Sequence, residues 1–149
     1  MKPNKMKEVS IRMNQICMET MKELSSDFVA LATYNNEGKD IRWKFAAGNR
    51  NEKYKQITVR YGKGIAGQVM RSGSPMVIQS FPEDINGKAT DYPIMLAEQL
   101  VSCIAVPVQF NDKIWGVLLA GHRIEKGFTE EDRNKLMEAA KKVSYTISK

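Results

Sequence analysis

The chain has 149 residues, of which 42% are hydrophobic and 27% charged, and its formal net charge is +6. These values fit a single globular domain over residues 1–149 with a sizeable core. The lysines and arginines are scattered rather than gathered in a stripe beside aromatic residues, which argues against a nucleic-acid-binding protein.

The first half of the chain predicts a helix followed by a β-hairpin. Apolar residues recur at helical spacing over residues 5–24. Residues 28–34 and 41–47 have the composition of strands, separated by a turn over residues 35–39. A weak extended piece at 57–59 then precedes a short helix over 65–71.

The second half predicts a strand, a polar loop, a short helix and two long strands, in order over residues 76–79, 83–91, 92–100, 101–110 and 114–122. The two long strands form a second hairpin. A last helix starts at Thr129, whose side chain can cap it, and Asp132 favours the same end. Because hairpins pair antiparallel, we expect an α+β fold with one antiparallel sheet covered by the terminal helices.

Three glycines open the short helix at 65–71, namely Gly62, Gly64 and Gly67. Glycine allows positive φ and a close approach of the backbone to a ligand. The free N–H groups at a helix start, with the positive end of the helix dipole, favour an anion. The spacing also matches a dinucleotide-binding fingerprint, but this helix stops after about two turns, too early for that fold.

A second helix start lies at Ile94. Pro93 suits the first turn of a helix, and Asp91 is expected to cap it. The starts at Ile65–Ala66 and at Ile94 could therefore direct backbone donors into one pocket. Trp43, on a predicted strand, could add its indole N–H, because a buried indole needs a hydrogen-bond partner.

Catalytic and metal sites have little support in the sequence. His122 stands at the end of a predicted strand, where we expect a hydrogen-bonded edge residue. Cys17 and Cys103 lie far apart in apolar patterns without metal-ligand spacing. We therefore expect two reduced core cysteines, no metal and a cytoplasmic protein. Trp115 is interpreted as a residue that packs on the sheet. No stretch is apolar for long enough to span a bilayer, and no signal peptide is expected at the start of the chain.

Five motifs follow one another in the order found in the GAF domain family, which the chain resembles over nearly its whole length. They lie at residues 62–69, 75–78, 102–108, 115–119 and 128–132. The resemblance implies a central antiparallel sheet of about six strands. The N- and C-terminal helices would then pack on one face and a ligand pocket would lie on the other.

Within this family the chain looks similar to single-domain nitrate receptors of the NreA type. That resemblance implies that nitrate is bound without a cofactor or catalysis, by backbone amides and an indole N–H. The ligand-binding residues that it implies are Trp43, Ile65, Ala66, Tyr92, Pro93 and Ile94. It also implies a partner, the oxygen-responsive sensor histidine kinase of a two-component system that controls nitrate respiration. Nitrite and other small anions stay open as ligands.

Two other functions remain open at this point. Cys103 on a predicted strand would suit a GAF-fold thiol reductase of small oxidised molecules such as free methionine sulfoxide. The apolar stripes of both terminal helices would suit a module that dimerises without a ligand. Whether or not the domain binds a ligand, we expect weak homodimerisation through the terminal helices, at Met6, Met13 and Leu136.

Overall fold

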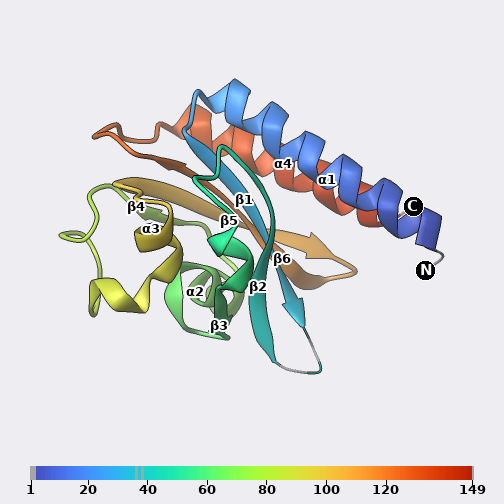
Figure 1. Cartoon of the computed structure of the whole chain (residues 1–149), viewed down its shortest axis with the longest axis horizontal. Coiled ribbons are helices and arrows are strands. Elements are labelled where there is room, and N and C mark those ends of the chain that lie inside the picture. The colour runs from blue at the N-terminus through green and yellow to red at the C-terminus, as the bar shows by residue number, and fades with distance from the viewer. Residues whose placement is uncertain (1–2, 36, 38, 149) are drawn as a thin grey trace.

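The computed structural model describes residues 3–35, 37 and 39–148, and places one curved sheet between two pairs of helices (Figure 1). Residues 36 and 38 of the predicted turn lie outside the described part. The helices are α1 (Pro3–Leu24), α2 (Gly64–Ser72), α3 (Pro93–Ala97) and α4 (Glu130–Ser148), with short 3₁₀ turns η1 (Lys53–Gln56) and η2 (Ala89–Asp91). The strands are β1 (Phe28–Asn35), β2 (Asp40–Ala47), β3 (Thr58–Arg60), β4 (Met76–Ile78), β5 (Ser102–Phe110) and β6 (Lys113–His122).

All neighbouring strands run antiparallel, in the order β3-β2-β1-β6-β5-β4. The two predicted hairpins, β1–β2 and β5–β6, are joined at the centre of the sheet because β1 pairs with β6. The expected α+β fold with six antiparallel strands is therefore confirmed. Among the described residues, none of the helices combines the length and the apolar character that a membrane span requires.

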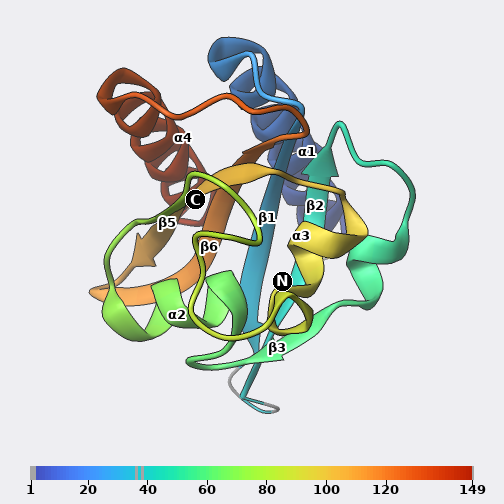
Figure 2. The ribbon, with the colours of Figure 1, turned by 90° about the vertical axis from the view of Figure 1, so that its left-hand side faces the viewer.

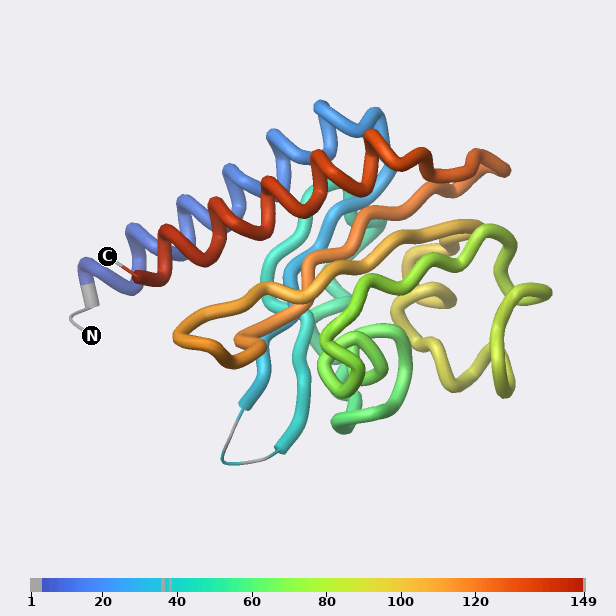
Figure 3. The backbone as a smooth tube through the Cα atoms, turned by 180° about the vertical axis from the view of Figure 1, so that it is seen from behind, coloured from blue at the N-terminus to red at the C-terminus, as the bar shows by residue number. Residues whose placement is uncertain are grey.

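The terminal helices α1 and α4 lie side by side and antiparallel on one face of the sheet (Figure 3). Met13 of α1 and Leu136 of α4 are fully buried against this face. The expectation that both residues form a homodimer contact is therefore wrong, because the same apolar stripe covers the sheet of its own chain. Met6, the third residue of that expectation, is 56% exposed.

The opposite face of the sheet is covered by α2, α3 and the segments that join them (Figure 2). Strand β1 contributes to both faces: Ala30 and Ala32 belong to the layer under α2 and α3, whereas Val29 and Leu31 pack under α1 and α4. A central strand buried on both sides needs an unbroken apolar run rather than alternation, and residues 28–32 supply one.

Two helix ends show how local chemistry sets the element boundaries. The Thr129 hydroxyl accepts the Asp132 N–H at 3.1 Å, and the Asp132 carboxylate accepts the Thr129 N–H at 2.9 Å, so the predicted cap of α4 is confirmed. In contrast, α3 ends at Ala97, three residues earlier than predicted. Gln99 has a φ of 53°, which no α-helix accommodates.

Candidate functional site

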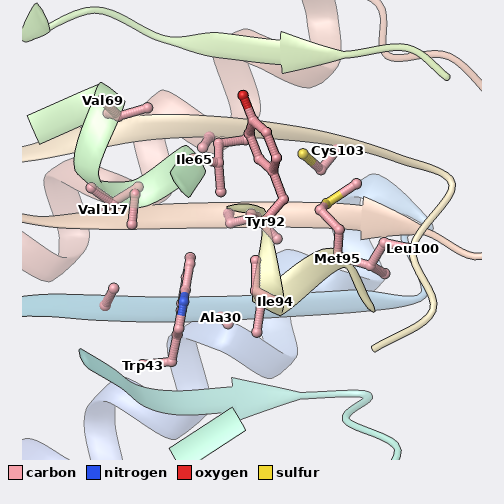
Figure 4. Close-up of a cluster of buried hydrophobic side chains, with 14 of the residues drawn as sticks. Ala30, Trp43, Ile65, Val69, Tyr92, Ile94, Met95, Leu100, Cys103 and Val117 are labelled. Carbon is pink, nitrogen blue, oxygen red and sulfur yellow. The ribbon is translucent and has the colours of Figure 1, made fainter. Parts of the chain in front are cut away.

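Five of the six predicted ligand-binding residues lie in one buried apolar cluster under α2 and α3. Trp43 comes from β2, Ile65 and Ala66 from the first turn of α2, and Tyr92 and Ile94 from the start of α3. None of the five is more than 2% exposed. Figure 4 shows the Trp43 ring extending from β2 across β1, with Ile94 beside it and Ile65 next to the Tyr92 ring. Pro93, the sixth, is half-buried at the first position of α3.

The start of α2 is shaped by its glycines. The Gly62 N–H donates to the Gly67 carbonyl and the Gly67 N–H to the Lys63 carbonyl, both at 2.9 Å. A Cβ on Gly67 would lie 2.4 Å from the Arg60 carbonyl oxygen, so no larger residue fits there. The N–H groups of Ile65 and Ala66 precede any intrahelical acceptor, and in the described part of the chain no hydrogen bond to either is found.

The start of α3 leaves one backbone donor. The Tyr92 N–H already donates to the Ala89 carbonyl at 3.0 Å, and Pro93 has no N–H. Ile94 therefore supplies the first available N–H. The expected cap by Asp91 is wrong: Asp91 belongs to η2, and its carboxylate accepts the Lys88 N–H at 2.9 Å.

The two large aromatic residues of the cluster have different polar roles. The Tyr92 hydroxyl donates to the Asn86 carbonyl at 3.1 Å and accepts a hydrogen bond from Gln68 Nε2 at 3.0 Å. It points away from Trp43 (Figure 4) and ties the preceding loop to α2. The Trp43 indole N–H has no hydrogen-bond partner among the described residues, so this donor is available to a ligand.

A buried ion pair holds α3 against the end of the sheet. Glu98 caps the C-terminal end of α3 and is fully buried. Its Oε1 accepts Arg123 Nη2 at 2.6 Å and the Arg50 backbone N–H at 2.8 Å. Arg123 also donates from Nε to the Glu98 carbonyl at 2.8 Å and from Nη2 to the Gly48 carbonyl at 3.0 Å. The pair thereby fixes the helix that carries Ile94.

Sequence reasoning missed this pair. Glu98 and Arg123 are 25 residues apart, so only tertiary structure brings them together. The available signals were a glutamate inside a mostly apolar predicted helix and an arginine directly after an apolar strand. A buried charge needs a partner of opposite sign, and the two residues could have been matched on that ground.

A comparison with protein-family models matches a GAF domain over residues 12–148. The chain belongs to the GAF domain family. A search of the curated proteins finds no match.

Several solved structures are similar to this chain. One described as a Staphylococcus aureus NreA protein mutated in its nitrate binding site is 35% identical, with a TM-score of 0.74, over 80% of this chain and 88% of that one. A second structure with the same description is 33% identical, with a TM-score of 0.74, over 84% of this chain and 98% of that one. The free methionine-R-sulfoxide reductase of Neisseria meningitidis is 17% identical, with a TM-score of 0.75, over 94% of this chain and 78% of that one. The last likeness shows the fold alone.

The thiols of this GAF domain are not placed for redox chemistry. Cys103 is fully buried on β5, and burial raises the pKa of its thiol far above the ordinary value. Burial likewise raises the pKa of Cys17, on α1 and buried against the sheet, to about 12. A reactive cysteine needs an accessible thiolate, so neither residue supports the reductase alternative.

His122 has neither the position nor the bonding expected of it. It lies on β6, which is an interior strand of the sheet, and it is 1% exposed. Its ring stacks on Phe128 with centroids 4.4 Å apart, and its Nε2 has no hydrogen-bond partner among the described residues. The expectation of a hydrogen-bonded edge residue is wrong. Within the same described ranges, no group of three or more His, Cys, Asp and Glu side chains could hold a metal ion.

Proposed function

We propose that this GAF domain is a nitrate receptor without catalytic activity. The observation that carries the proposal is the meeting of three separate segments, around Trp43, Ile65–Ala66 and Ile94, in one buried cluster with available N–H donors. The 33% and 35% identity to NreA structures, whose descriptions name a nitrate binding site, supports nitrate as the ligand.

The proposed contacts fit the chemistry of a flat monoanion. Nitrate loses strong hydration on burial, and fixed N–H donors can replace it. The amides of Ile65 and Ala66 stand at the positive end of the nine-residue helix α2, Ile94 adds a third amide, and Trp43 adds its indole N–H. Tyr92 and Pro93 would line the site without donating to it, because the Tyr92 N–H is already bonded and proline has none.

The output of the proposed receptor is the modulation of an oxygen-responsive sensor histidine kinase of a two-component system that controls nitrate respiration, in the cytoplasm. A ligand shifts such an equilibrium by as much as its affinity differs between the two states. The nitrate-bound and nitrate-free forms must therefore bind the kinase with different affinity. Kinase autophosphorylation, measured with this protein and with or without nitrate, tests this part separately.

Homodimerisation through the terminal helices remains part of the proposal, now carried by other residues. Met6, Ile11 and Met18 of α1 are each more than 50% exposed, so they are available to a second copy. Sedimentation at increasing protein concentration measures the association. A profile that stays monomeric at high concentration removes this element and leaves the ligand site untouched.

Trp43→Phe tests the ligand site. The substitution keeps most of the packing area and removes the indole N–H, and a lost hydrogen bond to a charged ligand weakens binding by about ten- to a hundredfold. Trp115→Phe is the matched control, because Trp115 is half-buried and packs toward the terminal helices. Calorimetric titration with nitrate, nitrite and chloride gives the affinities. A flat titration with every anion, or unchanged nitrate affinity in Trp43→Phe, contradicts the proposal.

A further inference from the structure

A hollow of about 740 Å³ opens at the C-terminal end of α2, away from the amides at its start. It lies between the last turn of α2, the end of β1 and the β5–β6 hairpin. Its lining includes four aromatic residues and two cations: Tyr34, Tyr61, Phe110, Trp115, Arg71 and Lys113. The volume falls in the range of roughly 300–1,000 Å³ that holds small organic ligands.

The aromatic rings stand at the rim because of the strands that carry them. The rings of Tyr34, near the end of β1, and Tyr61, just after β3, meet edge to face with centroids 6.4 Å apart. The turn between β5 and β6 has Asn111 and Asp112 at φ of 52° and 62°, as a tight hairpin turn requires. It sets Phe110 on the facing lip. Half-exposed rings in this arrangement offer stacking surfaces to a flat ligand.

The charges at the hollow are unbalanced. Arg71 and Lys113 make no ion pair or side-chain hydrogen bond with any described residue, and no carboxylate is among the lining residues. The guanidinium of Arg71 lies over Gly62, where an added Cβ would be 3.3 Å from Arg71 Nη1 and where φ is 86°. Glycine at 62 thus leaves room for the guanidinium next to the backbone.

We propose that this hollow binds a planar aromatic anion, namely one or two fused rings that carry a carboxylate or a phosphate group. The rings would stack on Tyr34 and Tyr61. The oxyanion would accept two parallel hydrogen bonds from the planar guanidinium of Arg71, with Lys113 as the second cation. This site is independent of the proposed nitrate site, because none of its lining residues belongs to the group Trp43, Ile65, Ala66 and Ile94.

Calorimetric titration of the full chain with three matched probes tests the proposal. We expect 2-naphthoate and 2-naphthyl phosphate to bind saturably, with at least one dissociation constant below about 1 mM. The relative affinity of the two identifies the preferred oxyanion. The neutral 2-naphthamide is expected to bind at least about tenfold more weakly, since it lacks the charge-assisted pair.

Variants separate this site from the nitrate site. Arg71→Gln and Tyr61→Ala should each weaken binding of the preferred probe roughly tenfold, with melting temperatures recorded as a check of the fold. Arg133→Gln, at an exposed arginine of α4, is the control and should bind like the wild type. Trp43→Phe should lose nitrate affinity and retain naphthoate affinity. Three results would each overturn the proposal. They are equal affinity for the amide and the two acids, unchanged probe affinity in Arg71→Gln, and the absence of saturable binding.

Discussion

Removing the buried carboxylate of Glu98 should destabilise the domain strongly. Glu98→Ala leaves the Arg123 guanidinium and the Arg50 N–H without the acceptor that they now share at 2.6 and 2.8 Å. Breaking a buried ion pair costs about 3–5 kcal/mol. The Arg123 side chain is 27% exposed and keeps its bond to Gly48, so water and the backbone compensate in part. We therefore expect Glu98→Ala to lower the free energy of unfolding by about 3 kcal/mol, which corresponds to a melting temperature lower by roughly 6–12 °C.

Two further variants make this prediction specific. Glu98→Gln keeps an acceptor oxygen and loses the charge, so its free energy of unfolding should be lower than that of the wild type by about 1–2 kcal/mol. Glu138→Ala is the control, since Glu138 pairs with Lys141 at 3.1 Å on the exposed side of α4, where a pair contributes about 0–1 kcal/mol. Urea unfolding followed by circular dichroism gives the free energies of unfolding. If the free energy of unfolding of Glu98→Ala lies within about 0.5 kcal/mol of the wild-type value, the ion pair does not hold α3 in place.

Two smaller predictions concern β6 and α4. Burial first, and then the charge of Lys126, lower the pKa of His122 below its ordinary 6.5, against the opposing effects of Asp27 and Asp132. The unfolded chain therefore binds this proton more readily, and the free energy of unfolding should fall as the pH drops from 6.5 through the lowered pKa. In His122→Asn that dependence should be absent, and a wild-type-like pH profile would contradict the argument. Thr129→Ala should cost about 1 kcal/mol through loss of the helix cap, while the exposed Thr90→Ala should change the unfolding free energy little.

The parts of the fold that could be predicted are those with a local signal. The long strands β5 and β6 have unbroken apolar runs, and Thr129 carries a recognisable cap. The turns η1 and η2 have no apolar period, and the end of α3 depends on the positive φ of Gln99, so their boundaries were missed. An apolar helix stripe does not tell which surface covers it. Met13 and Leu136 were therefore assigned to a partner instead of the sheet.

The candidate site divides in the same way. Glycines and a proline mark helix starts in the sequence itself, which made Ile65, Ala66 and Ile94 predictable as positions with free amides. The Glu98–Arg123 pair and the hydroxyl bonds of Tyr92 depend on contacts between distant segments. Those contacts leave no periodic or motif signal, so they became visible in the structure alone.

The two cysteines lie in different apolar layers: Cys17, on α1, lies between the terminal helices and the sheet, and Cys103, on β5, lies under α2 and α3. Each thiol can react with an alkylating reagent only when its own layer opens, so the native chain carries one internal reporter for each side of the sheet. A ligand that binds one layer opposes the opening of that layer. Nitrate bound beside Trp43 should slow alkylation of Cys103 more than that of Cys17, and the ratio of the two rates would report the occupied side in the unmodified protein.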